Sequence, residues 1–178
     1  GYLKLELQQK TDHMKILQLF VAVAVTILAA SCNNAKNMKT EVPEISAFST
    51  GKSNVAYEQY FSGRSWLAPL TSMKALNVPV SNVTFEPGCR NNWHIHHAQK
   101  GGGQMLICVY GRGWVQLEGE PAHELKVGEV FNIPPNVKHW HGAAKDSWFQ
   151  HLSLEVPGEG TSNEWLEPVT DEVYDKLP

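Results

Sequence analysis

Histidines crowd into one short stretch of the sequence, WHIHH, and a run of glycines follows it. Residues two apart share a face of an extended strand, so His94 and His96 point together. His139 and His141 repeat this alternation further along the chain, and His151 lies in a third segment of strand character. Neutral imidazoles are good ligands for Zn, Fe, Ni, Cu or Mn. Although a single histidine in a strand is more often structural, these five at matching positions predict a metal site.

An amide side chain follows the cluster at Gln104, the first residue of the next expected strand. Its oxygen can face the same interior as the histidines, where it would be a harder fourth donor. The glycines before it allow the connecting loop to turn without steric cost. For His97 and His123 we accept the ordinary interpretation of a structural histidine.

Short strands separated by turn residues are expected to position these side chains from about residue 55 onward. The expected strands are residues 81–86, 93–97, 104–110, 113–118, 123–126, 129–133, 137–141 and 147–156. Turns are expected at residues 87–88, 111–113, 119–121, 127–128 and 134–136. Regularly spaced short strands favour a closed barrel or jelly roll, so the predicted fold class is all-β.

The composition is that of a globular protein with a real core, since 42% of the 178 residues are hydrophobic and the formal charge is −3. The 15 basic residues do not exceed the 18 acidic ones, and no basic run is present, so nucleic acid is not an expected partner. The sequence has no glycine-rich phosphate loop and no Gly-x-Ser-x-Gly elbow. Their absence argues against nucleotide use and covalent hydrolase chemistry.

The N-terminal segment has the layout of a secretory signal. An apolar run follows Met14, and the small residues Ala29, Ala30 and Ser31 precede Cys32, which resembles a bacterial lipobox. A buried helix or a simple membrane anchor is the alternative. We therefore expect Met14 to be the true start and Cys32 to be lipidated.

The expected organisation follows from this signal. Residues 1–32 are upstream sequence and a lipoprotein-type signal segment, residues 33–54 are a polar tether, and residues 55–178 are the folded domain. The protein would then be a lipoprotein of the bacterial cell envelope, in the periplasm or at the outer membrane. It would contact a membrane only through this N-terminal segment.

The other two cysteines, Cys89 and Cys108, lack metal-knuckle spacing and a CxxC partner. A disulfide and two free, partly buried thiols are both compatible with the sequence.

Two motifs around the histidines resemble those of the cupin family. The first consists of a glycine, five residues, His-x-His, a gap, an oxygen ligand, six residues and a glycine; here it includes Gly88, His94, His96, Gln104 and Gly111. The second motif includes Gly128, Pro134, Pro135, Asn136 and His139. The resemblance implies a double-stranded β-helix, or jelly-roll barrel, with His94, His96, Gln104 and His139 as the metal ligands.

The phrases FEPG, WHIH, KHWHGAA and WLEPVTDE resemble more specifically the small single-domain bacterial cupins of the carboxymuconolactone-decarboxylase-associated group. This group includes manganese-dependent cupin hydroxynitrile lyases, and the resemblance covers roughly residues 61 to 174. It favours manganese as the divalent metal, with Zn, Fe, Ni or Cu as alternatives. It also favours His151 as the residue that moves a proton, whereas His141 is either a second candidate or a packing residue.

The sequence departs from that group at two places. The segment between His96 and Gln104 is about four residues longer, so the identity of the substrate cannot be transferred. Asn136 replaces the usual glycine of the second motif. Because Asn tolerates the left-handed backbone conformation better than most residues do, we expect the turn to survive.

Three classes of function are compatible with these residues. The first is a metal-dependent lyase or isomerase that acts on a small oxygenated compound, and the resemblance favours it. The second is an iron or copper dioxygenase, from which metal identity and oxygen uptake would distinguish the first. The third is a non-catalytic envelope protein that binds a small ligand or a metal.

A homodimer is also expected, because cupins are commonly paired. Residues 55–68 carry Tyr57, Tyr60, Phe61 and Trp66, which could cover either a partner's sheet or the chain's own.

Overall fold

The computed structural model describes residues 46–71 and 78–178. All of the described residues belong to the second of two units into which the chain divides, Glu44–Pro178. The expected signal segment and Cys32 therefore lie outside the described residues. Within the described ranges, no helix combines the length and the apolar character needed to cross a membrane.

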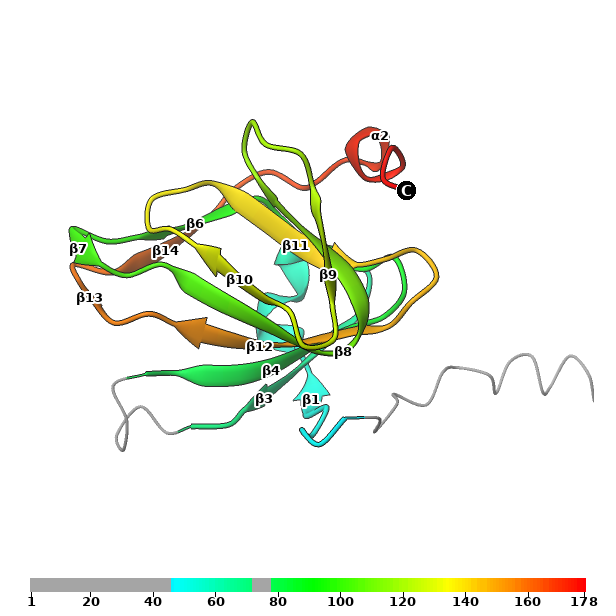
Figure 1. Cartoon of the computed structure of the whole chain (residues 1–178), viewed down its shortest axis with the longest axis horizontal. Coiled ribbons are helices and arrows are strands. Elements are labelled where there is room, and N and C mark those ends of the chain that lie inside the picture. Colours follow the sequence, from blue (N-terminus) through cyan, green and yellow to red (C-terminus); the bar gives the residue numbers. More distant parts are fainter. Residues whose placement is uncertain (1–45, 72–77) are drawn as a thin grey trace, which may run out of the picture. The chain divides into compact units, whose positions relative to one another are not determined.

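Antiparallel strands account for most of the second unit (Figure 1), and the all-β fold class is confirmed. The strands are β1 (Lys52–Ser53), β2 (Phe61–Ser62), β3 (Ser65–Pro69), β4 (Val80–Phe85), β5 (Arg90–Asn91), β6 (His94–His97), β7 (Lys100–Gly101), β8 (Gln104–Leu117), β9 (His123–Lys126), β10 (Val130–Ile133), β11 (His139–Ala143), β12 (Phe149–Glu155), β13 (Gly158–Glu159) and β14 (Ser162–Trp165). The helical elements are the 3-10 helix η1 (Val55–Tyr60) and the short helix α2 (Asp171–Tyr174).

Twelve of the strands form one curled sheet with two walls, and β8 belongs to both walls (Figure 1). β7 and β13 form a separate two-stranded sheet. The first half of β8 pairs with β10 and β12, and β12 continues through β4 and β3 to β1. The second half of β8 pairs with β9 and β11, and β11 continues to β5, β2 and β6. β14 completes this wall by pairing with β6.

The expected turn at residues 111–113 is wrong, because β8 runs without interruption through it. Gly111 adopts a φ of 65°, and the pairing of β12 with β8 shifts register between Gln150 and His151. An irregularity of this kind bends a strand and increases its twist without ending it. The glycine thus marks the place where β8 passes from one wall to the other.

Several short strands were not predicted from the sequence, including β1 and β14. β1 pairs with β3, and the side chains of Thr50 and Asn54 are buried. Part of the segment assigned to the tether, residues 33–54, thus packs on the folded unit.

The apolar core lies between the walls and includes the fully buried side chains Phe85, Leu106, Val115 and Phe149. Cys89 and Cys108 belong to this core, and both are free thiols. Burial raises the pKa of Cys89 well above its usual value and that of Cys108 to about 11. Both side chains therefore stay protonated and serve as core residues.

The aromatic residues that precede β3 cover the chain's own sheet. Tyr60 stacks on Trp165 of β14, with ring centroids 4.6 Å apart and planes 6° apart. Phe61 packs near Phe85, with ring centroids 5.6 Å apart. The homodimer stays a prediction.

The C-terminal segment is fastened over β5 and β11 by a buried arginine. Arg90 donates from Nε to the Val169 carbonyl oxygen at 3.0 Å and pairs with Asp171. Its guanidinium also lies 4.5 Å from the ring centroid of Tyr174, whose hydroxyl donates to the Ala143 carbonyl oxygen at 2.6 Å. These contacts hold the chain end against the wall that carries the histidines.

The bend in β8 yields a prediction about stability. A Cβ atom added at Gly111 would lie 1.8 Å from the Trp148 carbonyl oxygen, whereas one added at Gly119, whose φ is 81°, would meet nothing within 4 Å. We expect Gly119→Ala to lower the free energy of unfolding by about 1 kcal/mol, the cost of the left-handed conformation. Gly111→Ala should lower it by at least about 3 kcal/mol, because backbone must also move. Urea unfolding of both variants measures the difference, and equal losses would contradict this account of the bend.

Candidate metal centre

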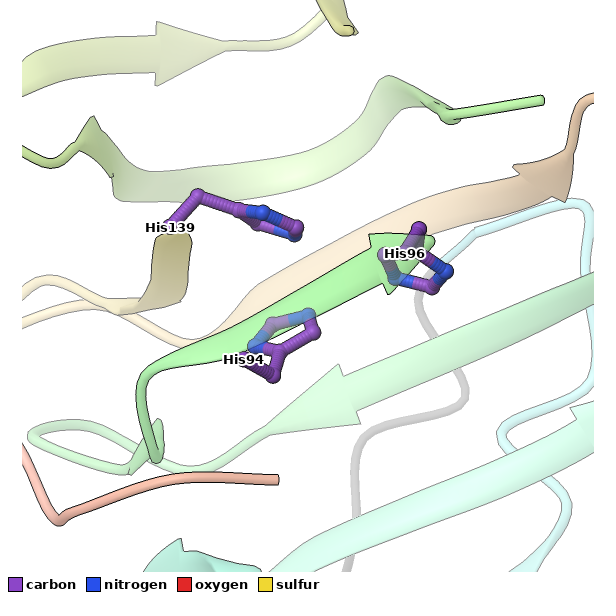
Figure 2. A group of neighbouring side chains, drawn as sticks. All are labelled: His94, His96 and His139. Carbon is purple, nitrogen blue, oxygen red and sulfur yellow. The ribbon is translucent and has the colours of Figure 1, made fainter. Parts of the chain in front are cut away.

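Three of the histidines expected to bind metal converge where β6 and β11 meet (Figure 2). The alternation of β6 turns His94 and His96 inward, and both are buried. Antiparallel pairing places His139 of β11 directly opposite His94. One nitrogen from each of the three rings lies within 4.8 Å of the others, so this group could hold a metal ion.

Backbone carbonyl oxygens orient two of these rings. His94 Nδ1 lies 2.9 Å from the Asn92 carbonyl oxygen, and His139 Nδ1 lies 2.9 Å from the Val137 carbonyl oxygen. A carbonyl can only accept, so each Nδ1 carries the proton and each Nε2 keeps a free lone pair. Nε2 of His139 and Nε2 of His96 are both buried and have no hydrogen-bond partner among the described residues.

Gln104 lines the same cavity as His94 and His96. Its Nε2 donates to Ser153 Oγ at 2.9 Å, while its Oε1 is buried and has no hydrogen-bond partner within the described ranges. Buried polar atoms normally find partners, so unpaired nitrogens and an unpaired oxygen beside one cavity are unusual. Three imidazole nitrogens and an amide oxygen fit a divalent metal ion.

Burial keeps His94 and His139 neutral. It holds the pKa of His94 well below its usual value, and the neighbouring rings of His139 and His96 lower it further. Burial likewise lowers the pKa of His139 to about 4. A ligand must offer a lone pair, so little proton competition is expected at neutral pH.

The cavity beside the histidines has a volume of about 170 Å³. Its apolar side includes Tyr57, Phe61 and Trp165. Trp165 pairs with His94 across β14 and β6, and its ring stacks on the imidazole with centroids 4.7 Å apart. A larger cavity of about 560 Å³ shares His96, Glu155 and Asn163 with the first, so Glu155 lies at the boundary between the two.

His151, the favoured candidate for moving a proton, and His141, the second candidate, form a buried pair. His141 lines the cavity, whereas His151 is fully buried and does not line it. His151 Nε2 lies 3.2 Å from His141 Nδ1, and the Asn91 side-chain oxygen accepts from the His141 backbone N–H at 2.9 Å. Burial lowers the pKa of His141 well below its usual value and that of His151 to about 4. The structure therefore places His141 nearer the cavity, and His151 behind it.

Reasoning from the sequence did not identify Asn91, Glu155 or Trp165 as residues of this site. Asn91 and Trp165 lie in short strands with no clear apolar alternation. The strand alternation used for the histidines could have identified Glu155, because it lies two residues after Ser153 and four after His151 along β12.

The turn before β11 behaves as expected. Asn136 adopts a φ of 64°, which confirms that it takes the left-handed conformation in place of the usual glycine. Its side chain also exchanges hydrogen bonds with the backbone of Ala98, at 2.9 and 3.1 Å. The turn is thereby tied to the longer loop that follows β6. That loop contains β7, which pairs with β13.

Comparison with known proteins shows which family the chain resembles. Residues 81–153 match the family model described as Cupin domain. The chain is 36% identical over 135 residues to an (R)-mandelonitrile lyase from Granulicella tundricola, an alignment that covers 75% of this chain and 98% of the relative.

Solved structures resemble the chain as well. A cupin-like protein from Thermotoga maritima matches with a TM-score of 0.63 and 40% identity, covering 73% of this chain and 95% of that one. A structure of DMSP lyases matches with a TM-score of 0.51 and 20% identity, covering 62% of this chain and 58% of that one. The second likeness, at so low an identity, shows the fold alone.

The buried histidines predict a loss of stability in acid for the metal-free protein. In the unfolded chain the pKa of a histidine returns to about 6.5, so the unfolded state binds protons first as the pH falls. The stability contributed by His139 and His151 is present above about pH 6.5 and is lost as the pH falls toward their folded pKa values of about 4. Urea unfolding of chelator-treated protein should show a loss of at least about 2 kcal/mol between pH 7 and pH 5. Equal stability at the two values would mean that the histidines are not buried as described.

Proposed function

Because the chain belongs to the cupin family, we propose that it is a metal-dependent lyase that acts on a small oxygenated compound. The metal ligands in this proposal are His94, His96, Gln104 and His139. The observation that carries it is the convergence of three histidine nitrogens beside a small cavity that Gln104 also lines. The 36% identity to an (R)-mandelonitrile lyase favours lyase chemistry over the alternatives.

We favour manganese, since the lyases that the sequence resembles depend on it. Three imidazoles with one amide oxygen also suit Zn, Fe, Ni or Cu. A divalent ion held by these ligands would polarise a hydroxyl or carbonyl oxygen of the substrate.

The cavity walls would hold the rest of the substrate. Tyr57, Phe61 and Trp165 offer an apolar side for its carbon skeleton, and the volume of about 170 Å³ restricts it to a small compound. For a cyanohydrin, this places the hydroxyl oxygen toward the histidines and the organic substituent against the aromatic side chains.

His141 is the residue of this proposal that moves a proton. Its ring lines the cavity, so it can accept the hydroxyl proton as the bond between the carbinol carbon and the nitrile carbon breaks. The released cyanide then takes this proton from His141, which returns to its neutral form, and the products are an aldehyde and hydrogen cyanide. His151, 3.2 Å behind His141, holds the ring in place and is a positioning residue.

The test of this reaction uses (R)-mandelonitrile as substrate and benzaldehyde absorbance as the readout. We expect the manganese-loaded protein to release benzaldehyde at equal rates under air and under nitrogen, and the chelator-treated protein to be inactive. A requirement for oxygen would overturn the lyase proposal in favour of a dioxygenase. No turnover of any cyanohydrin by a fully metallated protein would overturn it as well.

One prediction from this proposal concerns the metal ligands. We expect His139→Ala to lose most of the bound metal while the protein stays folded, because apolar burial and strand pairing hold the sheet together. His123→Ala is the matched control, since His123 is an exposed histidine on β9. Metal content per chain and circular dichroism measure the two effects. Full metal occupancy in His139→Ala would remove this residue from the site.

Another prediction from this proposal separates proton transfer from metal binding. We expect His141→Gln to keep its metal and to lower kcat about 100-fold or more, the usual contribution of a general base. His151→Gln should also keep its metal but reduce kcat less, because it acts through His141. A larger loss in His151→Gln than in His141→Gln would reverse the assignment of the two roles.

A further inference from the structure

We propose that Glu155 is a positioning residue that fixes how two metal ligands, His96 and Gln104, present themselves to the ion. The inference rests on the proposed metal site and does not depend on the reaction that the site catalyses. Glu155 ends β12 and pairs with Gln104, the first residue of β8. Its carboxylate contacts the side chains of both ligands.

The first contact determines which end of the Gln104 amide faces the cavity. Gln104 Nε2 donates to Ser153 Oγ at 2.9 Å and to Glu155 Oε1 at 3.3 Å. A hydroxyl can donate or accept, so Ser153 would tolerate either orientation of the amide. A carboxylate can only accept, and a flipped amide would bring its oxygen against the carboxylate oxygens. Glu155 therefore keeps the NH₂ group on its own side and leaves Oε1 available as a donor atom for a metal.

The second contact places an oxygen atom beside Nδ1 of His96, as backbone carbonyl oxygens do for His94 and His139. The Nδ1 atoms of His94 and His139 each face a carbonyl oxygen at 2.9 Å. His96 Nδ1 instead lies 2.9 Å from Glu155 Oε2, although the two groups are not aligned as a hydrogen bond. A negative oxygen beside Nδ1 favours the tautomer with its proton there, which leaves the Nε2 lone pair free.

The same carboxylate would also offset the charge of the site. The proposed ligands, three neutral imidazoles and an amide, bring no negative charge to a dication. Glu155 is 37% exposed, at the boundary of the two cavities, and it places one negative charge against the ligands without being a ligand itself. Carboxylates that hold metal-bound histidines in this way typically contribute 10- to 100-fold to metal affinity.

The chain offers a matched comparison on the same strand. His97, which neighbours His96, lies 2.7 Å from Glu164 through Nε2 and Oε2, but both side chains are well exposed. His97 is not in the group of histidines that could hold a metal. Glu155→Gln and Glu164→Gln therefore make the same chemical change to two glutamate–histidine pairs, one beside the site and one away from it.

The first measurement is the Zn²⁺ affinity of the full chain, by competition with a chromogenic chelator at fixed pH. We expect Glu155→Gln to weaken Zn²⁺ binding 10- to 100-fold and Glu164→Gln to leave it unchanged. The second measurement is the tautomer of His96, from ¹⁵N chemical shifts of the metal-free, histidine-labelled protein. The wild type should carry the proton on Nδ1, and Glu155→Gln should show a mixture of the two tautomers.

The outcomes separate this inference from the function proposed above. Wild-type Zn²⁺ affinity and an unchanged His96 tautomer in Glu155→Gln would overturn the role of Glu155 and leave the metal site standing. Equal weakening by both substitutions would also overturn it, because the effect would then be general. A wild-type protein that binds no Zn²⁺ or Mn²⁺ would overturn the metal site and this inference together.

Discussion

The pairing of His139 with His94 across β11 and β6 is the constraint on which the site depends. Side chains alternate along a strand, so a slip of one residue in this pairing would turn one of these histidines away from the other. Two further pairings hold the register. β11 pairs with β8 over five residues, and β6 pairs with β14 over four. The positions of the three histidines are thus set by backbone hydrogen bonds, which would form whether or not a metal is bound.

The second requirement is a protein interior that accepts many polar groups. His94, His96, His139, His141 and His151 are all buried. Unpaired, such groups would cost about 1–3 kcal/mol each. Carbonyl oxygens, Asn91 and Glu155 face several of their ring nitrogens. The atoms left without a partner among the described residues include Nε2 of His96 and Nε2 of His139, which are suited to a metal ion. The apolar cluster around Phe85 and Phe149 supports this polar region from one side, since both rings pack against His151.

Strand periodicity in the sequence was enough to place the histidines on common faces, and the resemblance to cupins supplied the choice of ligands. Other features needed the folded chain. The bend at Gly111 looked like a turn, because a glycine with positive φ serves both purposes, and only the continued pairing on either side distinguishes them. β14 was missed since its residues, SNEW, show little apolar alternation, so Trp165 was not connected with His94. The order of His141 and His151 relative to the cavity depends on packing between strands, which no local pattern encodes.

Because β14 lies near the end of the chain, the proposed metal site would be completed late in synthesis. This order affects which metal ion the site could select. β6 is synthesised before its neighbour β14, which comes some seventy residues later, and His139 lies between them. A nascent chain on the ribosome therefore exposes His94 and His96 without the ring of Trp165 or the third histidine. Selection by geometry is not available at that stage, because a loose pair of histidines follows the general affinity order of divalent metals. An ion bound at the proposed site would then be selected in the compartment where the chain completes its folding, from the metals present there.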